Sequence, residues 1–555
     1  MKKYLSLLLS LIIIFSVCAP VSSAFAADET NTEIPIIYIR GNGQSIVNAE
    51  GKEVVCDVAD FTLGSDSEDE EETKNKVVEA AVNILLPFFA EGLLSDSWDN
   101  YGKAVYEEIS PLFKEAILDG NGNAQYGTKL APEHVATNNK ATSTEKLSGY
   151  SFYTYGYHFD WRLSPYDLVD ELHKYIEAVM KVTNKKQVSL TSRCLGGSLL
   201  NVYLEKYAKN GHIKNVMYCD TLSNGCTLIS KGFSGQIEFD AKSIQRYEEE
   251  LEYLDEMGYG TGLNITGIAG EIVEKSIDLF TQIGVLDKFA DEIEELYGRL
   301  YQALIPALLK ATGVASQPIY WTFVEEEDFD LALKVMFGEE GSDEWNANSG
   351  LINKILMYRE NISSKHDEFL LEIKDKYNIH FGVIAKYGLM AAPITKGYDE
   401  LSDTLVSLRQ SSFGATCATI GSVLSDDEIS QDSIDKGYIS PDKQVDVSTC
   451  LFPETTWIVK NVHHDDFDKC CKALAEKFLK GDNVTVENSG YSRFRINDYK
   501  NNTVSDMTED NCADIEFVSK PVKEPTTFTK VFSLLNFFVV IIDFISRLFK
   551  GEIKF

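Results

Sequence analysis

Basic residues are scarce in this 555-residue chain, which has 52 Lys and Arg against 86 Asp and Glu. The formal net charge is therefore -34 at pH 7. Binding to nucleic acid needs clustered Lys and Arg that neutralise phosphates, so this deficit argues against a nucleic-acid partner. A strongly acidic exterior instead suits a soluble protein that works outside the cell.

Metal-binding motifs are also missing. The chain has 8 His and 10 Cys, but they show neither C-x-x-C nor H-E-x-x-H spacing, so we expect no metal and no other cofactor. The acidic run from Asp66 to Glu72 lacks EF-hand spacing and is typical of a solvated loop rather than a calcium site.

The N-terminus has the features of a signal peptide. Lys2 and Lys3 precede an apolar run over residues 4–17, and Ala24-Phe25-Ala26 has the small-x-small pattern that signal peptidase accepts. We expect cleavage after Ala26 and a secreted or cell-surface protein. A lipoprotein anchored through Cys18 is the alternative, but no small residue precedes that cysteine.

The cysteine count bears on reactivity. One of the 10 cysteines, Cys18, leaves with the signal peptide, and the nine that remain are an odd number. In an oxidising compartment an odd count implies at least one free thiol, although several cysteines of a fold can also be buried and reduced. Connectivity does not follow from the sequence.

Strand and helix patterns alternate in the first half of the chain. We predict strands at 34–39, 150–155, 187–191 and 213–219, and helices at 166–182 and 195–209. Such a βαβαβ series predicts a parallel sheet. Further strands are expected at 379–387 and 455–459.

Two helical insertions and a tail complete the predicted organisation. Residues 27–236 form the first part of the core, with an acidic and helical insertion at about 60–149, and residues 376–525 form the second part. Residues 237–375 are acidic and helical, as expected of an inserted cap. Residues 526–555 predict an amphipathic helix that lies on a membrane surface, packs on the fold or mediates oligomerisation.

A strand end, a tight turn and a helix start follow one another in Ser192-Arg193-Cys194-Leu195-Gly196. This order is typical of a nucleophile elbow, in which the residues two before and two after the apex must be small. Ser192 and Gly196 meet that requirement. The helix N-terminus favours a thiolate or an oxyanion beside the apex, Cys194.

The segment Phe159-Asp160-Trp161-Arg162 resembles the Tyr-Asp-Trp-Arg signature of lecithin:cholesterol acyltransferase-like lipases. The resemblance covers residues 35–43, 150–235 and 379–479. It implies an α/β-hydrolase fold, a mostly parallel sheet flanked by helices with a large helical cap insertion. It also implies acyl transfer through a Ser-Asp-His triad in that chain order, with Cys194 standing here in place of the serine.

The resemblance directs the choice of acid and base. Relatives carry an Asp-Gly-x-Val turn, and Asp442-Lys443-Gln444-Val445 is similar to it except at Lys443, so Asp442 is the expected acid. A plain turn aspartate is the alternative interpretation of Asp442. Asp403, in Asp403-Thr404-Leu405-Val406, is the alternative acid, although it can also be a helix cap.

Two histidines follow the final predicted strand, and His464 before Asp465 is the expected base. His463 is the alternative base. A surface metal site or a solvated loop are the other interpretations of the pair. The oxyanion hole would use the backbone N–H groups of Leu195 and Asn42.

These features predict an exported lipase, esterase or acyltransferase that acts on an ester or lipid acyl group through Cys194, His464 and Asp442. The partner is then a lipid or acyl-ester substrate, with membrane-surface contact through the C-terminal helix. The competing hypothesis is a catalytically inactive surface or interaction protein that keeps the fold.

Overall fold

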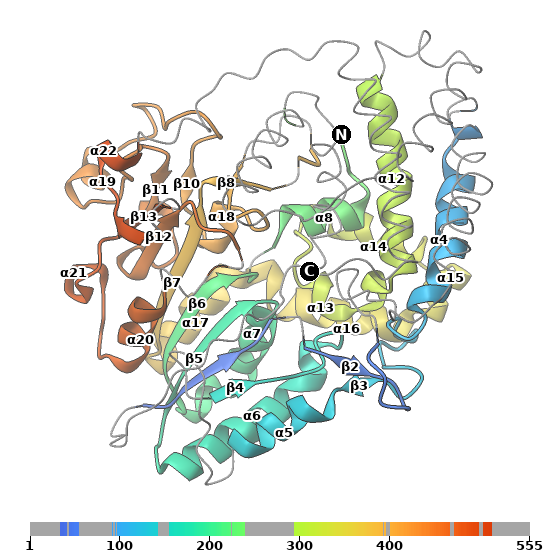
Figure 1. Cartoon of the computed structure of the whole chain (residues 1–555), viewed down its shortest axis with the longest axis horizontal. Coiled ribbons are helices and arrows are strands. Elements are labelled where there is room, and N and C mark those ends of the chain that lie inside the picture. Colours follow the sequence, from blue (N-terminus) through green and yellow to red (C-terminus); the bar gives the residue numbers. More distant parts are fainter. Residues whose placement is uncertain are drawn as a thin grey trace, which may run out of the picture.

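The computed structural model (Figure 1) describes the following residues: 34–54 except 42 and 43, 91–141 except 93, 94 and 96, 155–238 except 224, residue 243, 293–464 except 392 and 396–399, residue 466, 471–498 and 503–512. The predicted signal peptide, the acidic run at 66–72 and the C-terminal helix lie outside these residues. Among the helices so described, none combines the length and the hydropathy that a membrane span requires.

The centre of the fold is an eight-stranded sheet with the spatial order β14-β13-β12-β7-β6-β5-β1-β4. All of its neighbouring strands run parallel except the β13/β14 pair at one edge. The prediction of an α/β fold with a mostly parallel sheet is therefore confirmed. The strands are β1 (Ile36–Ile39), β4 (Tyr155–Tyr157), β5 (Val188–Cys194), β6 (Ile213–Thr221), β7 (His380–Tyr387), β12 (Thr456–Lys460), β13 (Phe494–Asp498) and β14 (Thr503–Asp506).

Helices flank both faces of the sheet. On β6, Met217 and Cys219 belong to one core cluster with Phe478, whereas Val216 and Tyr218 belong to a larger cluster on the opposite face. Both faces of β6 are therefore covered, and eight of its nine residues are buried. The principal helices are α4 (Asp99–Phe113), α5 (Pro132–Ala141), α6 (Pro165–Thr183), α7 (Gly196–Tyr207), α8 (Thr227–Ser234), α12 (Ile293–Ala311), α14 (Phe329–Phe337), α16 (Ser349–Asn361), α17 (His366–Tyr377) and α20 (Lys472–Lys480).

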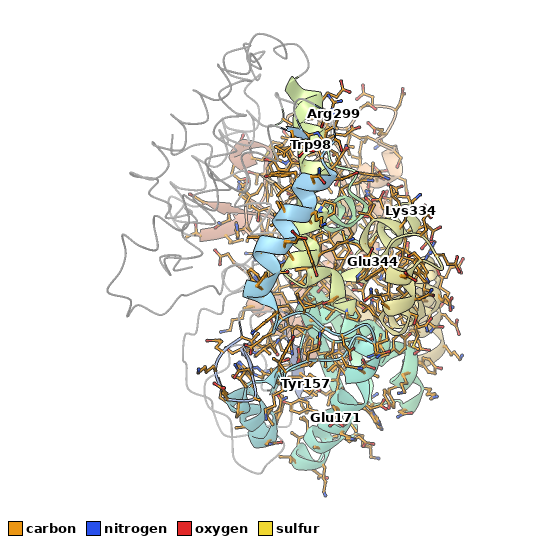
Figure 2. The ribbon with its side chains drawn as sticks, turned by 90° about the vertical axis from the view of Figure 1, so that its right-hand side faces the viewer. Trp98, Tyr157, Glu171, Arg299, Lys334 and Glu344 are labelled. Carbon is orange, nitrogen blue, oxygen red and sulfur yellow. The ribbon has the colours of Figure 1, made fainter. Side chains whose placement is uncertain are left out.

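Every element described between β6 and β7 is helical. Short helices α13 (Pro318–Trp321) and α15 (Asp343–Ala347) complete this region. Figure 2 shows α4 along one side of the molecule, where it packs against α12, with Trp98 and Arg299 near one end and Tyr157 and Glu171 toward the other. The predicted helical segments before β4 and between β6 and β7 therefore meet in the described structure.

The predicted strands and helices differ from the structure mainly at their ends. β4 begins at Tyr155, where the predicted strand ends, and β5 continues to Cys194. The edge strands β13 and β14 were not predicted, because polar residues dominate them. Three two-stranded sheets were also missed: β2 (Ile46–Val47) with β3 (Lys129–Leu130), β8 (Leu389–Met390) with β9 (Leu401–Ser402), and β10 (Thr416–Cys417) with β11 (Val445–Asp446).

Candidate active site

Cys194 lies at the carboxyl end of β5, and α7 begins two residues later at Gly196. Its backbone has a φ of 50°, a left-handed conformation that is uncommon for residues other than glycine. A Cβ atom on Gly196 would lie 2.5 Å from the carbonyl oxygens of both Ile39 and Arg40. The predicted strand, turn and helix are thus present, and the small residue after the turn is sterically required.

Of the two predicted oxyanion-hole residues, Leu195 is among the described residues and Asn42 is not. Leu195 follows Cys194 directly and is buried at the N-terminal end of α7, where backbone N–H groups have no intrahelical partner. Asn42 lies outside the described residues. The loop that would carry it is flanked by Gly41 and Gln44, which are described and buried.

The segment 159–162 supports the loop after β1. The side-chain oxygen of Gln44 accepts a hydrogen bond from the backbone N–H of Phe159 at 2.7 Å, and its carbonyl accepts one from the Trp161 indole at 3.1 Å. The Gln44 amide in turn donates to the carbonyl of Gly41. Phe159 and Trp161 therefore hold Gln44 in place by two hydrogen bonds.

Arg162 fixes the segment 159–162 to the core. Its completely buried guanidinium forms a bidentate pair with Asp160, with nitrogen to oxygen distances of 2.9 and 2.8 Å. It also donates to the hydroxyl of Thr128 and to the carbonyl of Glu115. Planar bidentate recognition of this kind needs arginine, because lysine offers only a point charge.

His464 and Asp403 form a buried pair at the edge of the sheet where β5, β6, β7 and β12 end. The Nδ1 atom of His464 lies 2.7 Å from Oδ2 of Asp403, and neither side chain is exposed. The backbone N–H of His464 also donates to the carbonyl of Asp403 at 2.8 Å. The pairing favours His464 over His463 as the base that an aspartate orients.

The Asp403 carboxylate is well stabilised as an anion. Burial alone would raise its pKa, but the charge and hydrogen bond of His464, the charge of Lys386 and the backbone N–H of Val406 outweigh burial and lower the pKa to about 2. The Oδ1 atom accepts hydrogen bonds from the backbone N–H groups of Leu405 and Val406 at 3.1 and 2.8 Å. Asp403 is therefore ionised across the physiological pH range.

The turn after Asp403 has an unusual backbone conformation. Thr404 has a φ of 89°, which a glycine adopts without cost and a β-branched residue adopts only under strain. The backbone at this position would therefore suit a glycine.

Asp442, the expected acid, is not the aspartate that contacts His464 in the structure. Its Oδ2 atom lies 2.6 Å from the ammonium of Lys460 and accepts a hydrogen bond from the Tyr387 hydroxyl at 2.9 Å. Its Oδ1 atom accepts one from Ser440. Asp403, the alternative acid, takes the place beside His464 because the hairpin of β8 and β9 carries it there.

Two charged residues near His464, Lys386 and Asp220, were not identified as site residues from the sequence. Lys386 of β7 forms a fully buried ion pair with Asp220 at 2.5 Å and donates to the carbonyls of His463 and His464. Arg193 donates to the same His464 carbonyl at 2.5 Å. The signal available in the sequence is a lysine within an otherwise apolar strand and an aspartate at the end of another.

Asp220 completes this cluster from the end of β6. Burial raises the pKa of its carboxyl group, and the charges of Lys386, His464 and Arg193 oppose that rise. Its backbone is also left-handed, with a φ of 48°. Buried charge and unusual backbone conformation therefore gather around the predicted base, as is common at functional sites.

Among the described residues, one cluster of three acidic side chains has the composition of a possible metal site. Glu325, Glu327 and Asp328 have oxygens within 4.8 Å of one another. Asp328 is already bound by the Lys231 ammonium at 2.9 Å and by the Ser230 hydroxyl at 2.6 Å. Lys231 therefore offsets part of the negative charge of this group.

A cavity of about 530 Å³ lies between α4, α12, α14 and α15. Its lining is partly apolar, with charged groups among it, and includes Trp98, Lys103, Lys310, Met336, Phe337 and Glu344. None of Cys194, Asp403 and His464 contributes to it. The cavity is therefore separate from the group of residues around His464.

Comparison of the chain with protein-family models, with curated proteins and with solved structures found no match. The site combines a thiol on a strained turn with a buried aspartate and the histidine that it contacts, in that chain order.

Proposed function

We propose that the chain is an α/β-hydrolase-fold enzyme that hydrolyses an ester or lipid acyl group, or transfers it to an alcohol. The nucleophile is Cys194, the base is His464 and the acid that orients the base is Asp403. The observation that carries this proposal is the fully buried pair of His464 and Asp403 at the sheet edge where Cys194 ends β5. α/β-Hydrolases have the same chain order of nucleophile, acid and histidine.

In the first half-reaction, the sulfur of Cys194 attacks the acyl carbonyl carbon while His464 accepts the thiol proton. Asp403 holds the Nδ1–H side of the imidazole and stabilises the imidazolium. The N–H of Leu195 donates to the oxyanion that forms, and the loop containing Asn42 would supply a second donor. The carbon–oxygen bond then breaks, the alcohol leaves with the proton from His464, and a thioester remains on Cys194.

In the second half-reaction, water or an acceptor alcohol attacks the thioester carbonyl and gives its proton to His464. The carbon–sulfur bond breaks, and the sulfur recovers a proton from His464. Water as the acceptor gives hydrolysis, and an alcohol gives acyl transfer. The two outcomes use the same residues.

In this proposal, segments outside the sheet control how the substrate reaches the site. The helical region 237–375 would act as a cap over the site, and the predicted C-terminal helix would hold this exported protein at a membrane surface. An apolar lipid or acyl ester fits such an arrangement, because its acyl chain leaves water on binding.

The test compares the wild type with Cys194→Ser, Cys194→Ala and His464→Ala on short and long p-nitrophenyl esters, with intact mass measured after rapid quenching. An acyl adduct on the wild type, lost in Cys194→Ala, is expected. Cys219→Ser is the matched control, because Cys219 is a buried thiol whose pKa burial raises to about 12. No turnover and no adduct in any form would instead support the inactive surface protein.

A further inference from the structure

Lys386 is a fully buried lysine in a strand whose other residues are mostly apolar. Its ammonium lies 2.5 Å from Oδ2 of Asp220 and donates to the carbonyls of His463 and His464 at 3.1 and 3.2 Å. An ammonium has three donors, and three acceptors surround this one. Lys386 thereby connects the ends of β6 and β7 to the loop that follows β12.

The carbonyl of His464 is bound by a second cation. The guanidinium of Arg193, adjacent to Cys194, donates to it at 2.5 Å. The backbone N–H of His464 is bound by the carbonyl of Asp403, and the ring is bound by the Asp403 carboxylate. The base is therefore held by Arg193 of β5, by Lys386 of β7 and by Asp403, which directly follows β9.

A gain in folding stability does not explain why Lys386 and Asp220 form a buried ion pair. Removing a lysine and an aspartate from water costs about as much as their attraction returns, and an apolar pair of the same size is often as stable. A fixed direction for the ring has a separate benefit, since a small misplacement of a catalytic group lowers the rate severely. We propose that Asp220 and Lys386 are positioning residues that hold His464 between Asp403 and Cys194. This inference rests on the proposed function.

The chain contains a matched control for this pair. Lys460 and Asp442 form a buried ion pair at 2.6 Å on the neighbouring strand, with side chains 6% and 9% exposed. In the register of β7 and β12, Lys386 is paired with Val459 and Tyr387 with Lys460, so the two lysines point to opposite faces of the sheet. Lys460 binds Asp442 and Gln444 rather than the histidine loop.

The experiment measures the rate of alkylation at Cys194 by iodoacetamide as a function of pH, in the full-length protein, with the modified residue identified by mass spectrometry. The variants are Asp220→Asn/Lys386→Met, the control Lys460→Met/Asp442→Asn, and His464→Ala. Replacing both members of a pair avoids leaving one buried charge alone. Circular dichroism and thermal unfolding establish that each variant is folded, and Asp220→Asn alone serves if the double variant does not fold.

We expect alkylation of Asp220→Asn/Lys386→Met to be at least tenfold slower than that of the wild type at pH 7, with the inflection of its pH profile moved to higher pH. The control double variant should stay within twofold of the wild type. A folded Asp220→Asn/Lys386→Met protein with the wild-type profile, alongside a slowed His464→Ala, would overturn the positioning role and leave the proposed function intact. Wild-type alkylation in His464→Ala would overturn both.

Discussion

The Nδ1 atom of His464 lies 2.7 Å from Oδ2 of Asp403, and both side chains are completely shielded from solvent. A second aspartate, Asp442, is bound by Lys460 instead. The two carboxylates are therefore distinguishable by experiment.

Asp403→Asn should lower kcat/KM for an activated ester by about 10³-fold to 10⁴-fold, because the amide presents the wrong hydrogen-bonding group to the imidazole. Asp442→Asn should change it only a few-fold, since Asp442 contacts Lys460 and Tyr387. Steady-state kinetics on both purified variants measure this contrast. Equal losses in the two variants would contradict the assignment of Asp403.

His158 should make the protein sensitive to acid. Burial, with the nearby charges of Arg40 and His134, lowers its pKa to about 2. The unfolded chain, with an ordinary histidine pKa of about 6.5, binds the proton first as pH falls. The free energy of unfolding is therefore highest above pH 6.5 and falls by about 1.4 kcal/mol per pH unit below it.

Urea unfolding of the wild type and His158→Phe between pH 7 and pH 4 checks this expectation. The phenylalanine keeps a ring beside His134, on which His158 stacks with centroids 4.6 Å apart. The unfolding free energy of His158→Phe should fall less steeply than that of the wild type as the pH is lowered. Parallel pH curves for the two proteins would show that another group controls acid unfolding.

Arg162→Met should destabilise the fold by about 3 to 5 kcal/mol, because it leaves the buried carboxylate of Asp160 without its partner. Arg162→Met/Asp160→Asn should recover part of that loss. Lys206→Met removes an exposed ion pair with Asp170 and should have almost no effect. Denaturant unfolding gives all three values, and a loss in Arg162→Met no larger than in Lys206→Met would refute the anchoring role.

Thr404→Gly should stabilise the protein by about 1 kcal/mol, because it relieves the strain of a β-branched residue at a φ of 89°. The gain is reduced by the greater freedom of glycine in the unfolded chain. Asn184→Gly is the control, since asparagine tolerates its φ of 55°. Thermal unfolding of both variants tests the difference, and a destabilised Thr404→Gly would mean that Thr404 makes contacts worth more than its strain.

The central part of the fold was predictable from local patterns. Strands β6, β7 and β12 contain short apolar runs, and α6 and α7 have apolar residues at helical spacing. Parallel strands covered on both faces are rich in apolar residues, so these patterns are strong. The edge strands β13 and β14 carry no such pattern and were missed.

The elbow was predictable only in part. The succession of strand, turn and helix at residues 192–196 is a local feature, and the φ of 50° at Cys194 belongs to that turn. The steric need for glycine at Gly196 comes instead from the carbonyls of Ile39 and Arg40, which are distant in the sequence.

The identity of the acid was decided by tertiary structure. Asp403 and Asp442 lie in segments with the same Asp-x-x-Val pattern, and Asp442 is nearer to His464 along the chain. Which of them meets His464 depends on a contact between residues 61 positions apart, made by the hairpin of β8 and β9. The pairing of Lys386 with Asp220 depends likewise on the packing of β6 beside β7. Local sequence specifies which backbone conformations a segment can adopt, whereas the partners of a buried charge depend on which strands the completed sheet places side by side.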